Sequence, residues 1–240
     1  PPGVRAQAWY LQPDGTLGAA KPTADGGASA FVVNPALGDR VTLPGSSEND
    51  AFDALPGYQW ANDAPGDADV FLSAPLTATQ TYIGTANADL WVKSTSKQAD
   101  LEVTLSEVRP DGTEMYVQSG WLRGSMRALA SDATRLDPNH GDYARDVRPV
   151  PTDHFTEAQV EIFPFAHVFR AGSRIRISVH TPGGDRPRWS WILADQPAGT
   201  AIGVAHDAAH PSRLLLPKAT TPPDAPEQPA PCPSLRGQPC

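Results

Sequence analysis

Short stretches in which apolar and polar residues alternate recur along this chain, and they constrain its fold more than any other feature. In one of them Leu101, Val103 and Leu105 share one face, while Glu102 and Thr104 share the other. This period of two predicts half-buried β-strands, because successive side chains of a strand point to opposite faces. Comparable strand-forming stretches occur at residues 4–12, 29–33, 69–73, 80–85, 88–94, 113–120, 158–162, 174–179, 189–194 and 202–205.

Two segments with the sequence Pro-Asp-Gly separate pairs of these strands, at residues 13–15 and 110–112. Proline presets the φ angle of a turn and glycine readily adopts a positive φ, so both segments are predicted to be hairpin tips. Helical spacing is found only roughly at residues 122–133, where Gly124 interrupts it. About ten short strands joined by turns predict an all-β fold, a two-sheet β-sandwich of jelly-roll type.

The strands are expected to belong to one domain that is followed by a tail. The polar stretches 35–67 and 130–154 are interpreted as long loops over the sandwich, because they are rich in Asp, Asn, Gly and Pro. The chain is rich in Pro after residue 217, which favours an extended tail. We therefore expect a jelly-roll domain at residues 1–217 and a Pro-rich extended tail at residues 218–240.

Charge and hydropathy disfavour two classes of partner. The chain has 19 Lys and Arg against 27 Asp and Glu, a net charge of −8, and no basic cluster, so a nucleic-acid surface is not expected. It contains no apolar run long enough for a membrane-spanning helix. Because the sequence begins Pro1-Pro2-Gly3, without Met or a signal-like segment, we expect a processed chain or a fragment.

The two cysteines, Cys232 and Cys240, both lie close to the end of the chain. A zinc site needs four ligands, and no His or further Cys is near them in sequence. A disulfide that closes a small loop in the tail is the preferred hypothesis, and two free thiols are the alternative. Since disulfides persist in oxidising compartments, this hypothesis favours secretion.

Two groups of residues could in principle hold a metal. Asp67 and Asp69 are candidate calcium ligands, but their spacing does not match an EF-hand loop, and a solvated acidic loop is the simpler interpretation. His206 and His210 superficially resemble a zinc-binding helix. Because a strand-like segment precedes them and Pro211 follows, we expect a loop that leads into the last strand.

Six tryptophans offer candidates for contact with a partner domain or a ligand. Trp189 and Trp191 lie two residues apart, so on a strand they would share one face. A place in the sandwich core is the simpler interpretation for these two, and docking of a domain or stacking of a sugar is the alternative. Trp60, and Trp121 with nearby Arg123, are better candidates for exposed contacts, since interfaces favour Trp and Arg.

Six stretches carry a resemblance to a known family, at residues 9–17, 70–76, 88–94, 100–112, 120–123 and 210–217. In their order and spacing they are similar to the C-terminal jelly-roll domain of the cocaine esterase / X-prolyl dipeptidyl peptidase family of serine hydrolases. The resemblance covers about residues 5–217. It implies a non-catalytic β-domain that packs on an α/β-hydrolase catalytic domain of the same polypeptide.

The resemblance also implies where the chemistry lies. The family's catalytic Ser, His and Asp belong to the hydrolase domain, upstream of the part matched here. Consistently, the chain lacks a Gly-x-Ser-x-Gly nucleophile elbow, since the segments that begin at Gly45 and Gly172 both fail the pattern. The parent protein would cleave acyl esters or X-Pro peptides through a serine nucleophile, without a metal or organic cofactor. This domain would wall one side of the active-site cleft and could support a homodimer.

Two other functions stay open at this point. The chain could be a free-standing carbohydrate- or peptide-binding module that uses surface aromatics, or an enzyme that uses its acidic loops. A domain that docks on a partner should expose an extended apolar patch when isolated, whereas a binding module should present a compact aromatic platform.

Overall fold

The computed structural model of this chain describes residues 3–34, 64, 66–141, 143–183, 193–197 and 199–224. Within these ranges nearly all regular structure is β-strand, and two single-turn 3-10 helices, η1 (Gly124–Met126) and η2 (Ala144–Asp146), are the exceptions. The all-β prediction is confirmed. None of the helices described is long and apolar enough to cross a membrane.

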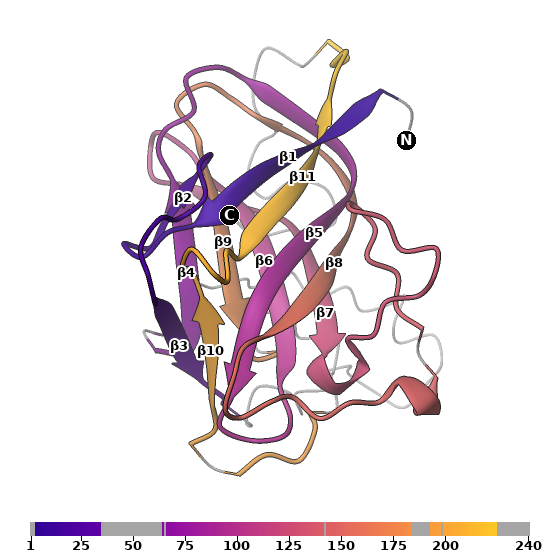
Figure 1. The fold of residues 1–240 in the computed structure, drawn as a ribbon. Helices are drawn as coiled ribbons and strands as arrows, with labels where there is room; N and C mark the ends of the chain where they lie inside the picture. Colours follow the sequence, from indigo (N-terminus) through magenta and orange to yellow (C-terminus); the bar gives the residue numbers. More distant parts are fainter. Residues whose placement is uncertain are drawn as a thin grey trace, which may run out of the picture.

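The eleven described strands form a jelly-roll sandwich of two layers (Figure 1). They are β1 (Val4–Leu11), β2 (Thr16–Gly18), β3 (Ala28–Val32), β4 (Ala68–Ser73), β5 (Gln80–Ser94), β6 (Asp100–Val108), β7 (Glu114–Arg123), β8 (Thr156–Phe169), β9 (Arg174–His180), β10 (Ala201–Ala205) and β11 (Arg213–Ala219).

The first layer is built around β5. Strand β8 pairs with one edge of β5, and β11 and β10 pair with successive parts of its other edge. β1 follows β11, and β3 follows β10. The second layer has the order β4-β9-β6-β7, and β2 connects the layers by pairing antiparallel with β1 and parallel with β4.

Two predicted strands differ from the observed ones. The stretches expected at residues 80–85 and 88–94 are one continuous strand, β5, with a bulge between Gly84 and Ala86. Continuous pairing with β8 carries the strand across this irregularity. The strand expected at residues 189–194 lies mostly outside the described residues.

Both Pro-Asp-Gly segments form the predicted hairpin tips, between β1 and β2 and between β6 and β7. In the first turn the amide of Gln12 donates to the carbonyl of Thr16 at 2.9 Å, and Gly15 has a φ of +75°. In the second the amide of Arg109 donates to Thr113 at 2.8 Å, and Gly112 has a φ of +86°. The two turns therefore use the same chemistry, as their shared sequence indicated.

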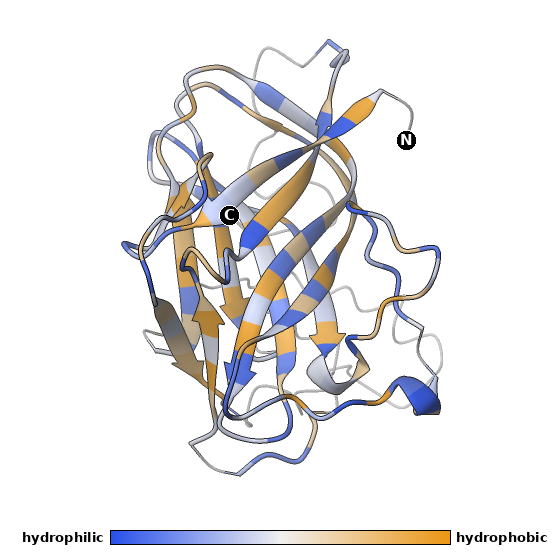
Figure 2. Ribbon diagram, in the orientation of Figure 1, coloured by the Kyte–Doolittle hydropathy of each residue, from blue (hydrophilic) through white to orange (hydrophobic). Residues whose placement is uncertain are grey.

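The core lies between the layers and follows the predicted alternation, which Figure 2 shows as bands along β5 and β8. Leu101, Val103 and Leu105 of β6 are fully buried there. Their polar neighbours Glu102 and Thr104 are also buried, so β6 is covered on both faces. The sequence pattern alone had indicated a half-buried strand.

The two layers meet again where β7 contacts β8, and we call this place (Gly120, Trp121, Glu161 and Phe163) the corner. A Cβ atom placed on Gly120 would clash with the backbone carbonyl group of Glu161. Only glycine allows the two backbones to approach so closely. The corner thus closes the sandwich on the side opposite β2.

Between β7 and β8 the chain makes a long excursion, residues 124–141 and 143–155, which we call the arm. It contains η1 and η2 but no long strand, in agreement with the loop expected at residues 130–154. The other expected loop, at residues 35–67, lies mostly outside the described residues. β11 continues past the expected boundary at residue 217, because its residues up to Ala219 pair with the start of β1.

The corner predicts an unusually severe effect for a minimal substitution. Gly120→Ala should lower the free energy of unfolding by about 3 kcal/mol or more, because the added methyl group meets the backbone of β8. Gly203→Ala, in strand β10, is the matched control. Its Cβ would lie 3.6 Å from the nearest atom, so the change should stay below about 1 kcal/mol. Equal losses of stability in urea denaturation would contradict the assignment.

Candidate functional site

The contact residues predicted from sequence fall partly within the structure. Trp121 and Arg123 lie on β7, whereas Trp60, Trp189 and Trp191 lie outside the described residues. The half-buried Trp121 ring packs against that of Phe163 with ring centroids 5.3 Å apart and planes tilted by 56°. Phe163 itself remains 48% exposed.

Arg123 has a structural partner. Its Nε atom donates to Oδ1 of Asp100 at 3.2 Å, and its Nη2 atom donates to Oδ2 at 3.3 Å. Asp100 is fully buried and also accepts a hydrogen bond from the amide of Ala194 at 2.6 Å. A buried carboxylate is costly without such partners. Arg123 therefore stabilises the fold by pairing with Asp100.

Asp67 and Asp69, the calcium candidates, are held by neutral side chains. Ser29 donates to Oδ2 of Asp69 at 2.5 Å, and Asn34 donates to Oδ2 of Asp67 at 3.4 Å. Burial raises the pKa of Asp69, although the hydrogen bond from Ser29 opposes this rise. Within the described ranges, no three His, Cys, Asp or Glu side chains are grouped so that they could hold a metal ion.

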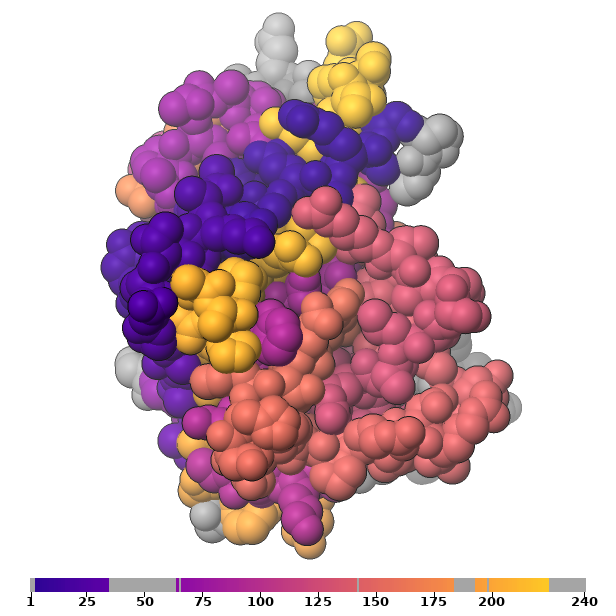
Figure 3. All heavy atoms as spheres, viewed as in Figure 1, coloured from indigo at the N-terminus to yellow at the C-terminus, as the bar shows by residue number. Residues whose placement is uncertain are grey.

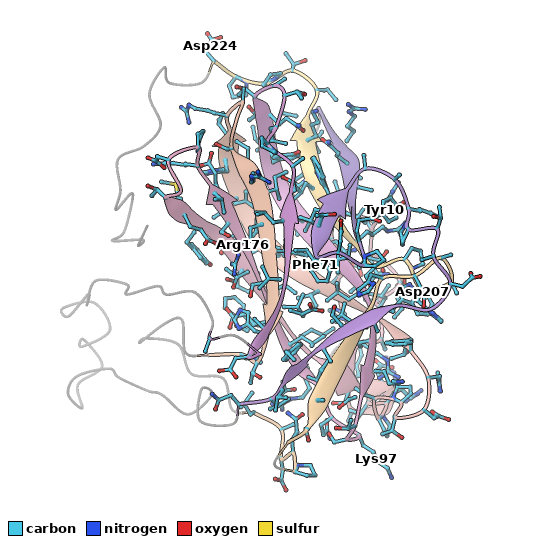
Figure 4. The ribbon with its side chains drawn as sticks, turned by 90° about the vertical axis from the view of Figure 1, so that its left-hand side faces the viewer. Tyr10, Phe71, Lys97, Arg176, Asp207 and Asp224 are labelled. Carbon is cyan, nitrogen blue, oxygen red and sulfur yellow. The ribbon has the colours of Figure 1, made fainter. Side chains whose placement is uncertain are left out.

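The two histidines of the zinc-like motif lie on the predicted loop and face different surroundings. The ring of His206 packs against Phe71 at 6.1 Å, whereas the ring of His210 packs against Trp91 at 5.0 Å. Asp207 stabilises the conformation of this loop, since its Oδ1 atom accepts a hydrogen bond from the amide of His210 at 2.6 Å. The positions of Phe71 and Asp207 in the fold can be followed in Figure 4. No helix presents the two imidazoles on one face here.

One imidazole does contact hydroxyl groups. Nε2 of His180 lies 3.1 Å from the hydroxyl of Thr104, which lies 3.0 Å from that of Ser119. The other ring nitrogen, Nδ1, donates to the carbonyl oxygen of Thr181 at 3.0 Å. All of these side chains are buried, so a substrate has no access to them. These contacts join β6, β7 and β9 of the second layer.

A half-buried imidazole contacts a buried carboxylate between β6 and β8. Nε2 of His167 lies 3.0 Å from Oε2 of Glu107, which is only 2% exposed. Burial alone would raise the pKa of Glu107, but hydrogen bonds from His167 and Ser173 outweigh it and lower the pKa below its ordinary value. The pair therefore stabilises an ionised carboxylate inside the fold.

A polar cluster that the sequence reasoning missed occupies the outer face of the first layer. Asp89 of β5 is 4% exposed and binds Arg213 of β11 through two contacts, 2.8 Å to Nε and 2.6 Å to Nη2. Beside it, Asn87 donates to Gln159 of β8 at 2.8 Å. Asn87 and Asp89 alternate with core residues along β5, and this alternation could have indicated a polar outer face.

Glu157 of β8 completes this cluster as a second carboxyl group. Burial is the main cause that raises the pKa of Glu157 to about 7. A hydrogen bond to Asp89 and the negative charge of Asp89 add to this rise. Oδ1 of Asp89 is buried and accepts no hydrogen bond within the described part of the chain. The neutral form of Glu157 is therefore favoured up to about neutral pH.

Comparison with known proteins points to one kind of domain. The family model described as "X-Pro dipeptidyl-peptidase C-terminal non-catalytic domain" matches residues 1–215. A Mycobacterium bovis protein named "Putative serine esterase Mb1866c" is 26% identical over 223 residues, which cover 90% of this chain and 34% of that protein.

Solved structures share the fold. A CocE/NonD family hydrolase from Staphylococcus aureus matches with a TM-score of 0.66 and 18% identity, over 91% of this chain and 37% of that one. An aminopeptidase from a Thaumarchaeota archaeon of marine sediment matches with a TM-score of 0.68 and 19% identity, over 91% and 37% respectively. The chain thus spans about a third of the length of the proteins it matches.

The raised pKa of Glu157 predicts a specific dependence of stability on pH. The pKa of Glu157 is about 7 in the fold against an ordinary 4.5, so its stabilising effect is complete below about pH 4.5 and is lost as the pH rises through 7. In urea denaturation the free energy of unfolding should therefore fall between about pH 5 and pH 8, and Glu157→Gln should flatten this fall.

Asp25→Asn removes an exposed carboxylate and serves as the control for the loss of one negative charge. This variant should keep the pH dependence of the wild-type chain. An unchanged slope in the Glu157→Gln variant would show that Glu157 does not cause the pH dependence.

Proposed function

The chain belongs to the family of X-Pro dipeptidyl-peptidase C-terminal non-catalytic domains, and we propose that it serves as the accessory β-domain of a secreted α/β-hydrolase-type serine hydrolase. The match to this family over residues 1–215 carries the proposal. A further support is that the matched proteins are about three times as long as this chain, which leaves room for a separate catalytic domain in each. The catalytic residues of the whole protein would then lie outside this chain.

The proposed reaction of the whole protein is acyl transfer through a serine nucleophile, with an ester or an X-Pro peptide as substrate. The M. bovis relative is named as a serine esterase, and the family is named after X-Pro dipeptidyl-peptidases. In such a reaction the nucleophile forms an acyl-enzyme intermediate, which water then hydrolyses. Neither a metal nor an organic cofactor takes part in this mechanism.

The proposed role of this domain is to pack on the catalytic domain and to form one wall of its active-site cleft. A sandwich closed at the corner and at β2 is a rigid body, which suits a wall that must keep its shape. Trp121 and Phe163 place aromatic surface at one edge of this body. A homodimer formed through the same domain is the competing arrangement for that surface.

A free-standing binding module is less well supported. Such a module would need aromatic rings arranged as a flat platform for a sugar or peptide. The planes of Trp121 and Phe163 are tilted by 56°, so the two rings do not form a continuous platform. The accessory domain is therefore the function that the molecule supports best.

The isolated 240-residue chain should have no hydrolase activity of its own. It should neither react with a fluorophosphonate probe nor hydrolyse a p-nitrophenyl ester, because it lacks a nucleophile elbow. A known serine esterase labelled in parallel is the positive control. Stoichiometric labelling of this chain would overturn the proposal.

The native gene product that contains this sequence should be much heavier than 25.5 kDa and should be found in the culture medium. Mass spectrometry of medium and cell fractions measures both properties. A product of about 25.5 kDa would favour a module that works alone. A heavy product confined to cells would contradict secretion but not the accessory role.

Secretion also predicts the state of Cys232 and Cys240, which lie outside the described residues. Peptide mapping of the secreted protein under non-reducing conditions should find one bridge between them. Quantitative alkylation without prior reduction is the complementary measurement, and modification of both thiols would contradict the disulfide.

A further inference from the structure

Within the described residues, most of the large apolar side chains that remain exposed lie on the arm or at the corner. Within the described part of the chain they are Leu129, Tyr143 and Val147 on the arm, Phe163 at the corner, and Val32 on β3, with exposed fractions between 44% and 55%. Four of these five therefore lie on the arm or beside it. Figure 3 shows the arm standing out on the right of the molecule.

The backbone of the arm is held in place by polar contacts. The guanidinium group of Arg127 donates to three backbone carbonyls, at 3.0 Å to Gly124, 2.8 Å to Arg148 and 3.2 Å to Pro149. Leu129 and the residue that it faces, His140, form an isolated antiparallel bridge. The arm therefore has a defined conformation although it contains no long strand.

Further contacts attach the arm to the sandwich. The side chain of Asn87 donates to the carbonyl of Arg135 at 3.1 Å, and Nε2 of His140 lies 2.9 Å from the carbonyl of Gln159. Near its end, Val150 is buried, and its amide donates to Lys97 at 3.0 Å. These anchors hold the arm against β5 and β8.

The arm thus combines a fixed backbone with exposed apolar side chains. Arg127 turns toward the arm's own backbone, while Leu129, Tyr143 and Val147 are exposed. Arg145 lies over the ring of Tyr143 at 4.1 Å, and Tyr and Arg are enriched where proteins contact one another. A surface that is ordered before binding loses little conformational entropy when it docks. Exposed apolar side chains on an ordered segment are typical of an interface, and they are unfavourable on a loop that stays in contact with water.

We propose that Leu129, Tyr143 and Val147 of the arm, together with Trp121 and Phe163 of the corner, form the surface on which the catalytic part of the same polypeptide docks. The inference rests on the proposed function. In a C-terminal domain of this family, the remaining two-thirds of the protein precedes the chain.

The opposing surface should be apolar at its centre. Leu129, Val147 and Phe163 offer hydrocarbon only, and Tyr143 offers a ring with one hydroxyl group. The guanidinium group of Arg145, whose side chain is 74% exposed, suits a carboxylate at the rim of the contact. A second copy of this chain is the competing occupant.

The test uses the whole gene product that contains this chain and the double variant Tyr143→Ser/Val147→Ser. Val32→Ser is the matched control. Val32 is 48% exposed and Val147 is 45% exposed, so the two valines are similarly accessible to solvent. Val32 lies on β3, outside the proposed docking surface. In the whole protein the double variant should speed limited proteolysis between the two parts at least about tenfold, whereas the control should match wild type. In the isolated chain both variants should unfold as wild type does, because their side chains are exposed there.

The possible results separate the docking surface from the proposed function. If the double variant and the control are cleaved at the same rate as the wild-type whole protein, the docking surface is wrong although the accessory role stands. If the double variant converts a dimer to a monomer in analytical ultracentrifugation and leaves proteolysis between the parts unchanged, the occupant is a second copy and the proposal fails. If the gene product has no catalytic part, the proposed function itself fails.

Discussion

The contact between the backbones of β7 and β8 at Gly120 and Glu161 is the constraint on which the rest of the structure depends. It joins the edges of the two layers without a side chain between them. The same contact brings the Trp121 ring against Phe163 and sets the point from which the arm leaves β7 and returns to β8. Closure of the sandwich and presentation of an apolar surface are thus two consequences of one close approach.

The charged groups inside this sandwich serve the fold. Asp100 binds Arg123, Asp89 binds Arg213 and Glu157, and Glu107 binds His167. In each set a buried carboxylate of one strand is paired with a side chain from another strand. This use of titratable groups is what a non-catalytic domain requires, since a catalytic group must also be reached by its substrate.

Local patterns in the sequence predicted most of the described strands, the two hairpin turns and the loop at residues 206–210, but not the short strand β2 or the bounds of β11. The partners of polar side chains could not be predicted in the same way. Arg123 was expected to make an exposed contact, but its guanidinium group binds Asp100, because register pairs the end of β7 with the start of β6. The carboxyl pair of Asp89 and Glu157 likewise depends on the register of β5 and β8, which alternation along one strand does not specify.

The account's central claim is that this chain is the non-catalytic part of a larger serine hydrolase. The most direct measurement is to label the native gene product with a fluorophosphonate and to locate the modified serine by peptide mass spectrometry. The account predicts a single labelled serine outside these 240 residues, within a Gly-x-Ser-x-Gly segment. A labelled serine inside this chain, or a gene product that is not labelled at all, would contradict it.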